Sequence, residues 1–296
     1  QCPACKAFVG TISIKSTEDG GRYLHCSSCS RRFVQDKDSG FFAFFIGARK
    51  SEGSSMLHEE MDGSFFTNRK FKELCLNSQI FWLRQALEGY KRKTMVYVGC
   101  GTGEYAVHLK GLYLQYYGLE PFPISAKFAI DEATIPENTV LVQYDSTKGI
   151  PVKNNVADIL LLVASYDHIP NPEEFMKDAY SKIKAGGYLL VLGSNYNFWA
   201  KRLASKITGK EMFRHEDRHF HVYSPASLIE EVQSCIDVKA EYVNADFFFL
   251  PNLPKHMSFL YFSKNFMVFL NGLLRHLFSF LSVKNAGSGM IVVFNK

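Results

Sequence analysis

The sequence predicts an α/β fold, with a mostly parallel sheet of seven strands preceded by a small N-terminal zinc ribbon. Two observations lead to this prediction. From position 93 onward, short apolar runs rich in β-forming residues alternate with helical patterns at intervals of roughly 20 to 30 residues, as in βαβ units. Two Cys-x-x-Cys pairs lie within the first 29 residues, which is typical of a site for one zinc ion.

Composition limits the class of protein. The chain has 296 residues, of which 47% are apolar and 21% charged, so it is long and apolar enough for one large and one small globular domain. This excludes a disordered or fibrous protein. The formal net charge is +5, with 34 basic and 29 acidic residues interleaved along the chain. That balance permits an anionic partner without requiring one.

Cysteine usage indicates a reducing compartment. Four of the seven cysteines form the two pairs, and Cys75, Cys100 and Cys235 stand alone, which does not resemble a disulfide framework. We therefore expect an intracellular, cytoplasmic protein. We also expect no signal peptide and no membrane span, because no apolar stretch reaches the length of about 18 residues that a span needs.

The pattern divides the chain into three parts: a zinc ribbon at 1–46, a linker and helix at 47–92, and a main domain at 93–296. The helix is expected around 71–87, where apolar residues recur at helical spacing. The seven predicted strands of the main domain are 95–98, 114–119, 139–143, 159–163, 188–192, 238–250 and 289–294.

The two Cys pairs are separated by 20 residues, and plausible strands of a hairpin lie between them at 11–14 and 23–25. Four thiolates would fill the tetrahedral coordination of Zn²⁺ and leave no position for water, so we expect a structural site. Such a small unit buries little apolar surface, so the metal would supply much of its folding free energy. The alternative is a coincidental pair of reduced dithiols. The predicted ligands are Cys2, Cys5, Cys26 and Cys29.

A glycine-rich turn follows the first strand of the main domain. Gly99, Gly101 and Gly103 stand between this strand and a helical pattern at 105–112. Glycine permits a tight bend and close approach of a ligand to the backbone at a helix N-terminus. By itself, this spacing also fits a dinucleotide site or a bare turn.

Two acids sharpen the interpretation. Glu120 ends the second strand, 17 residues after Gly103, and Asp145 follows the third strand. At these positions carboxylates can accept hydrogen bonds from ribose hydroxyls and from an adenine amino group. Together with the motifs at 157–161, 166–173 and 184–188, they make the stretch 95–192 resemble the class I S-adenosylmethionine-dependent methyltransferases, in particular the type 11-like enzymes of quinone-biosynthesis and glycan clusters.

That resemblance implies a Rossmann-like fold, S-adenosylmethionine as cofactor, and a role for each motif residue. The glycine loop, including Cys100, would hold the methionine part of the cofactor. Glu120 would hold the ribose. Asp145 and Ser146 would hold the adenine, and the wall near the sulfonium would be lined by Ala164, Ser165 and Tyr166.

One position departs from that family. Tyr97 stands two residues before the first glycine, where the family usually has an acid that helps to hold the cofactor's amino group. This departure motivates a third hypothesis, a non-catalytic scaffold with a degenerate cofactor site.

Candidates for the acceptor side lie later in the chain. His215, His219 and His221 suit a general base that takes a proton from the acceptor near neutral pH. The alternative is that one of them caps or packs the next helix and the others are solvated. His168 is expected to be a packed residue.

The segment at about 251–284 is rich in Phe and Leu and is predicted to form a helical insertion with a narrow polar stripe. It would line an apolar acceptor pocket or lie peripherally in a membrane interface. Core packing or a dimer contact is the alternative.

Two enzymatic hypotheses remain open. The first is methyl transfer to a small-molecule or lipid-linked acceptor. The second is an RNA methyltransferase, because the ribbon resembles small zinc domains fused or bound to several methyltransferases, including RNA enzymes. RNA binding would need basic and aromatic side chains on one ribbon face, and the candidates are Lys6, Arg22, Arg31, Arg32 and Phe33.

Overall fold

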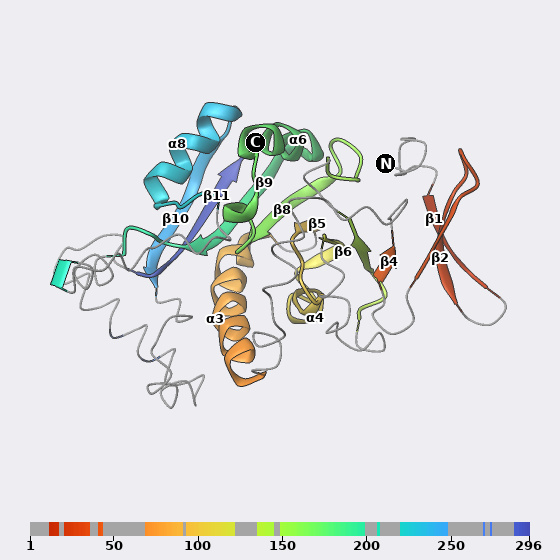
Figure 1. Ribbon diagram of the computed structural model, residues 1–296, viewed down its shortest axis with the longest axis horizontal. Helices are drawn as coiled ribbons and strands as arrows, with labels where there is room; N and C mark the ends of the chain where they lie inside the picture. The colour runs from red at the N-terminus through yellow and green to blue at the C-terminus, as the bar shows by residue number, and fades with distance from the viewer. Residues whose placement is uncertain are drawn as a thin grey trace.

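A central sheet and a smaller N-terminal sheet form the framework of the molecule (Figure 1). Both sheets belong to a computed structural model of the protein. The structure describes residues 12–17, 21–35, 41–43, 69–90, 93–121, 135–144, 149–198, 206–207, 220–247, 269, 273 and 287–296. Within these ranges no helix is long and apolar enough to cross a membrane.

The central sheet has eight strands in the order β10-β11-β9-β8-β5-β6-β7-β4. All neighbouring pairs are parallel except those made by β11, which runs against both β9 and β10. The chain moves outward from β5 through β6 to β7 and then returns to β8 on the other side of β5. The strand order therefore reverses at the carboxyl ends of β5 and β8, where open α/β sheets bind ligands. The bounds are β4 (Phe41–Ala43), β5 (Lys93–Val98), β6 (Tyr113–Glu120), β7 (Thr139–Gln143), β8 (Ala157–Val163), β9 (Ile183–Ser194), β10 (Lys239–Phe247) and β11 (Gly289–Asn295).

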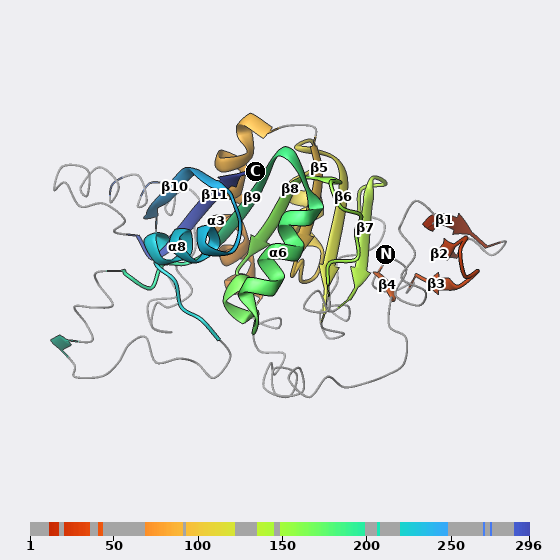
Figure 2. The same cartoon turned by 90° about the horizontal axis from the view of Figure 1, so that it is seen from above.

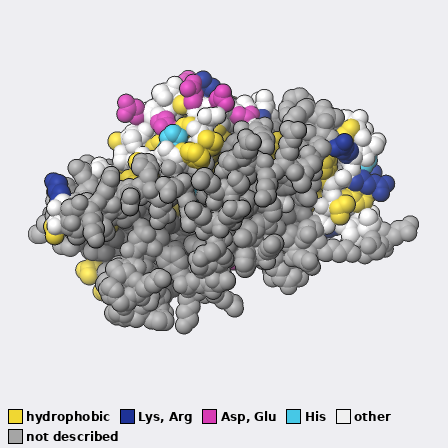
Figure 3. Space-filling view, in the orientation of Figure 1, with side chains coloured by type: hydrophobic (Ala, Val, Ile, Leu, Met, Phe, Trp, Pro, Cys, Tyr) yellow, Lys and Arg dark blue, Asp and Glu magenta, His cyan; other side chains and the backbone are white. Residues whose placement is uncertain are grey.

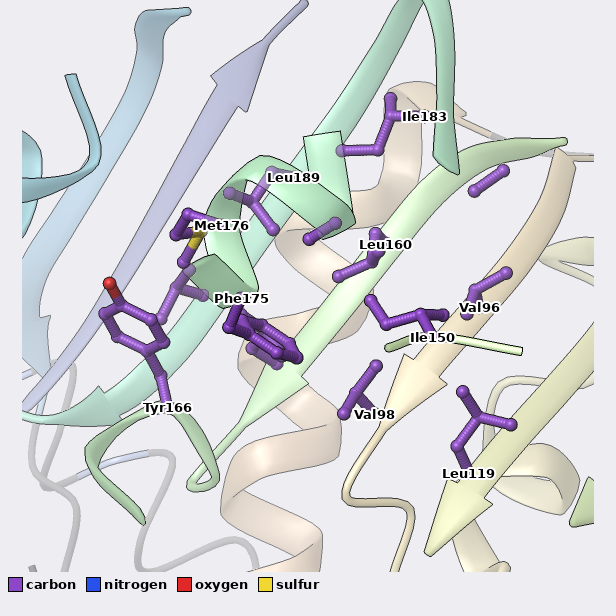
Figure 4. Packing of buried hydrophobic residues seen from close by; sticks show 14 of the residues in the cluster. Val96, Val98, Leu119, Ile150, Leu160, Tyr166, Phe175, Met176, Ile183 and Leu189 are labelled. Carbon is purple, nitrogen blue, oxygen red and sulfur yellow. The ribbon is translucent and has the colours of Figure 1, made fainter. Parts of the chain in front are cut away.

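Helices cover both faces of this sheet (Figure 2). Helix α3 (Arg69–Leu87) and the short α4 (Glu104–His108) pack on one face, against a cluster that includes Met95 and Tyr97. Helices α6 (Pro172–Lys182) and α8 (Pro225–Cys235) cover the other face, against Val96 and Val98 (Figure 4). Successive residues of each buried strand therefore face opposite apolar layers, which explains why the strands read as nearly continuous apolar runs.

The strand count differs from the seven that were predicted. The seven strands of the main domain are present, and an eighth, β4, comes from the N-terminal segment and pairs parallel with the edge strand β7. Phe42 of β4 is 1% exposed. An exposed sheet edge leaves unpaired backbone groups, so β4 both satisfies that edge and buries an aromatic ring. The helix predicted at 105–112 is also shorter, because α4 ends at His108.

The N-terminal sheet is an antiparallel meander of β1 (Ile12–Ser16), β2 (Arg22–Cys26) and β3 (Arg32–Val34). It contains the predicted hairpin and one further strand. A bridge between Gln35 and Phe42 connects it to β4, and its buried face packs into the same apolar cluster as Phe42. Cys2 and Cys5 lie outside the described residues, as does the segment 251–284 apart from Phe269 and Leu273.

Packing between β6 and its neighbours generates a stability prediction. A Cβ at Gly118 would lie 2.7 Å from Leu141 Cδ2 and 2.8 Å from Cys100 Sγ. Gly118→Ala should therefore lower the free energy of unfolding by about 1–3 kcal/mol, the usual cost of overpacking, as measured by urea denaturation. Gly193→Ala is the control, because nothing lies within 4 Å of the added methyl group. Equal effects of the two substitutions would contradict this account of the packing.

Candidate cofactor and acceptor site

The glycine loop follows β5 at the point where the strand order reverses. Gly99, Gly101 and Gly103 have φ angles of 79°, 57° and 83°, in the left-handed region that favours glycine. A Cβ at Gly99 would lie 2.7 Å from Ser165 Cβ, and one at Gly103 would lie 2.6 Å from Leu141 Cδ1. A Cβ at Gly101 would meet nothing within 4 Å. The loop is thus packed at both ends and open in its middle.

Glu120 fixes the loop against the neighbouring strand. Its side chain is 4% exposed, and its Oε2 accepts a hydrogen bond of 2.8 Å from the Gly101 backbone N–H. The backbone N–H groups of Gly99 and Cys100 donate to the carbonyl of Leu119, at 2.8 and 3.0 Å. The acid predicted to hold a ribose therefore lies directly beside the open part of the loop.

Cys100 contributes its backbone to the loop and its side chain to the core. The thiol is 1% exposed, and burial, assisted by the nearby Glu120 carboxylate, raises its pKa well above the usual value. A neutral, enclosed thiol is a packing group and a poor nucleophile. We therefore assign no chemistry to the Cys100 side chain.

The end of β8 forms the wall opposite the loop. Ala164 has a φ of 47°, which is uncommon for a residue with a side chain and costs of order 1 kcal/mol. Its N–H donates to the Leu192 carbonyl at 2.7 Å. The Ser165 hydroxyl donates to the Val98 carbonyl at 3.0 Å. The strained backbone at Ala164 is thus fixed by hydrogen bonds to β9 on one side and, through Ser165, to β5 on the other.

Tyr166 was expected to line the same wall, but its side chain turns toward α8. Its hydroxyl donates to Glu231 Oε1 at 2.7 Å, and the Tyr223 hydroxyl donates to the same oxygen at 2.8 Å. The two rings are stacked with centroids 5.1 Å apart. Burial, and then the bond to Glu231, raise the pKa of both phenols. Tyr166 (Figure 4) therefore joins the short helix η5 (Tyr166–His168) to α8. No sequence motif indicated Glu231.

His221 is the one predicted base that lies within the described residues, since His215 and His219 lie outside them. Its backbone N–H donates to the Asp167 carbonyl at 3.4 Å, and that of Phe220 does so at 2.9 Å. These bonds hold the backbone of His221 beside η5, the short helix that follows β8. Its Nε2 atom is buried and has no hydrogen-bond partner in the part of the chain that the structure describes.

Of the other residues considered for the cofactor and acceptor site, the structure describes only His168. Asp145 and Ser146 also lie outside the described ranges. His168, expected to be packed, has its Nε2 3.9 Å from Asp167 Oδ1 and a side chain that is 33% exposed. The described residues thus bring together the glycine loop, Glu120, the β8 wall and His221 along one edge of the sheet.

Comparison with known proteins identifies the family. Residues 67–234 match the methyltransferase domain, which covers more than half of the chain. The chain belongs to this family. It is an S-adenosylmethionine-dependent methyltransferase with the class I fold. No curated protein matches it at the sequence level.

Solved structures share the fold at low sequence identity. A methyltransferase from Archaeoglobus fulgidus is 19% identical, with a TM-score of 0.51, over 79% of this chain and 100% of that chain. A chain from a complex that contains the Haloferax volcanii Trm112 methyltransferase activator is 12% identical, with a TM-score of 0.53, over 84% and 99%. The [4+2]-cyclase SpnF is 16% identical, with a TM-score of 0.51, over 74% and 80%. These likenesses concern the fold alone.

Tyr97 marks the departure of this methyltransferase from the usual loop sequence. Its ring is 2% exposed and packs edge-on against Tyr105 and Tyr116, with centroids 5.1 and 6.5 Å away. Its hydroxyl donates to the Val163 carbonyl at 3.4 Å, and burial raises its pKa well above the usual value. The side chain belongs to the core beneath the loop. An acid here would be buried among aromatic rings at a high desolvation cost.

The shared carboxylate between η5 and α8 gives a second prediction. Glu231→Ala leaves the Tyr166 and Tyr223 hydroxyls without their acceptor, so the free energy of unfolding should fall by about 1–3 kcal/mol. Tyr166→Phe removes only one of the two donors, so it should lower the free energy of unfolding by less, about 1 kcal/mol. Glu230→Ala, at the exposed neighbouring position, should change it by less than about 0.5 kcal/mol. Urea denaturation measures the stability of all three variants. An equal loss of stability in Glu230→Ala and Glu231→Ala would contradict a stabilising role for the shared Glu231 carboxylate.

Proposed function

We propose that this methyltransferase transfers the methyl group of S-adenosylmethionine to a small-molecule or lipid-linked acceptor. The observation on which this rests is the buried Glu120 carboxylate beside the open Gly101, at the reversal of strand order. The cofactor supplies an electrophilic methyl group on a sulfonium. The protein's task is to bind, orient and desolvate the two reactants.

The residues present suit this cofactor. The open middle of the glycine loop admits a ligand against the backbone, and an enclosed carboxylate is the acceptor that a ribose diol needs. We assign the methionine part to the loop backbone, the ribose to Glu120, and the adenine to Asp145 and Ser146. Ala164 and Ser165 would form the wall near the sulfonium.

His221 is our candidate for the base on the acceptor side. A nucleophile that carries a proton must lose it during methyl transfer, and imidazole accepts protons near neutral pH. The buried Nε2 of His221 offers such an acceptor, and the His221 backbone is bonded to η5, which follows β8. His215 and His219 remain further candidates by sequence.

An apolar acceptor is favoured by the segment 251–284. Its two described residues, Phe269 and Leu273, are four positions apart and are 64% and 54% exposed. Large apolar side chains at helical spacing and in contact with water suit a lipid-linked acceptor or peripheral contact with a membrane surface.

The N-terminal unit is proposed to hold a structural Zn²⁺ through Cys2, Cys5, Cys26 and Cys29. Support comes from the second pair, because Cys26 ends β2 and Cys29 lies in the turn that follows. The Cys26 N–H donates to the Arg31 carbonyl at 2.9 Å, and Ser30 has a φ of 56°. Cys26 lies in the apolar cluster that includes Phe42, and Cys29 packs against the same cluster. Among the described residues no group of three or more metal ligands occurs.

The zinc proposal predicts one zinc ion per chain in the purified protein, measured by elemental analysis. Cys26→Ser should lose the metal, and a chelator should lower the thermal midpoint of the wild type, because metal binding contributes to folding of such units. Cys235→Ser, in α8, is the matched control and should keep its zinc. A folded, zinc-free wild type, or full zinc content in Cys26→Ser, would contradict the assignment.

RNA is the second candidate acceptor, and a specific observation favours it. Strand pairing places Lys15 opposite Tyr23 and Arg32 opposite His25, on the outer face of the N-terminal sheet. The Arg32 guanidinium lies 5.1 Å from the Tyr23 ring centre. Basic and aromatic side chains on one face suit single-stranded RNA. Figure 3 shows Lys and Arg side chains at this end of the molecule.

That face differs from the one expected from sequence. Phe33 is 5% exposed and turned inward, and the Arg22 guanidinium lies 5.8 Å from the ring centre of the buried Phe42. Lys6 lies outside the described residues. Alternation along strands places neighbours in sequence on opposite faces, so the set Arg22, Arg32 and Phe33 does not share one surface.

One assay tests the proposed function and separates the two acceptors. Purified protein with methyl-labelled S-adenosylmethionine is incubated with lipid extract, polar metabolites or RNA, and label should enter the lipid or metabolite fraction. Glu120→Gln should raise the KM for the cofactor about tenfold or more, because a charged hydrogen-bond acceptor is lost. The exposed Glu137→Gln is the control. Label in RNA alone would support the second candidate, and no transfer to any fraction would contradict both.

A further inference from the structure

Gln143, the last residue of β7, carries a buried side-chain amide nitrogen with no hydrogen-bond partner among the described residues. Buried polar groups in folded proteins are nearly always paired, because an unmade hydrogen bond costs free energy. Such a donor at the carboxyl edge of a parallel sheet calls for an acceptor that the protein itself does not supply.

The position of Gln143 relates it to the glycine loop. Side chains alternate along a strand, so Gln143 lies on the same face as Leu141, and Leu141 is the residue that a Cβ at Gly103 or Gly118 would meet. Gln143 is also the register partner of Glu120 on β6. Glu120 lies two residues after Gly118 on that same face, and its carboxylate is bonded to the Gly101 N–H.

The other neighbour of Gln143 is Ala43 of the added strand β4. Without β4, β7 would be the edge of the sheet, and water could reach its outer side. With β4 in place, Gln143 has a register partner on each side, Glu120 of β6 and Ala43 of β4. The N-terminal segment thus pairs with the strand that carries Gln143, whose amide nitrogen is buried, and a hydrogen bond to a buried group discriminates more strongly than one in water.

We propose that Gln143 donates a hydrogen bond to a ribose hydroxyl oxygen of the cofactor. A hydroxyl is a donor and an acceptor at once. It can donate to the Glu120 carboxylate and accept from the neighbouring Gln143 amide, so the two side chains form a complementary pair for a diol. This inference rests on the proposed cofactor site and adds to it a positioning residue that no motif indicated.

Calorimetric titration of the full chain with S-adenosylhomocysteine, adenosine and its 2′-deoxy and 3′-deoxy analogues tests the proposal. Gln143→Met keeps the volume and removes the donor. It should weaken the binding of S-adenosylhomocysteine and of adenosine about two- to tenfold, which is the contribution of one neutral hydrogen bond. It should also shrink the preference for adenosine over one deoxy analogue. Gln115→Met, near the amino end of β6, is the matched control and should bind like wild type.

The unliganded protein provides an independent readout. Because the donor is unpaired there, Gln143→Met should leave the urea midpoint unchanged or raise it, whereas a structural glutamine would lower it. If Gln143→Met binds these ligands with wild-type affinity, the proposed role of Gln143 is overturned, and the proposed function is not affected. An equal loss for adenosine and both deoxy analogues, with a lowered midpoint, would do the same. A wild type that binds no S-adenosylhomocysteine would overturn the proposed function and this inference together.

Discussion

The hydrogen bond from the Gly101 N–H to Glu120 joins the two features on which the site depends. A carboxylate that is 4% exposed must be paired with a donor, and a loop of left-handed glycines needs a fixed point to hold its shape. The Gly101 N–H gives the carboxylate a donor, and the carboxylate gives the loop a fixed point. The strand order of the sheet brings the ends of β5 and β6 side by side, and helices on both faces bury the strands beneath this bond.

Local sequence was enough to predict most of this arrangement. The seven strands of the main domain were found because each is an apolar run bounded by turn residues, and Glu120 because it directly follows such a run. Boundaries were missed where the chain is irregular. Strand β9 begins at Ile183, five residues before the predicted start, and its pairing with β8 shifts between Ala157 and Ile159, where the extra residues of β9 include Gly186 with a φ of 71°. Periodicity carries no signal for that irregularity.

Features formed by contacts distant in sequence were not predictable. Residues 41–43 were assigned to the zinc ribbon predicted at 1–46, yet they pair with β7 and so cover what would otherwise be the edge of the central sheet. Glu231 lies 65 residues from Tyr166 and was unremarkable in its helix. From the sequence, Tyr97 was interpreted as the loss of an acid that contacts the cofactor. In the structure its ring is part of an aromatic cluster with Tyr105 and Tyr116. Tyr97 therefore contributes to core packing beneath the loop.

Amide hydrogen exchange with and without S-adenosylhomocysteine tests the central claim most directly, because it reports on the loop backbone itself. The account predicts that ligand slows exchange at residues 99–103 and at the carboxyl ends of β6 and β7, and leaves the pairing of β10 with β11 unchanged. Binding without slower exchange at Gly101, or protection confined to other strands, would contradict the assignment of the cofactor to this edge of the sheet.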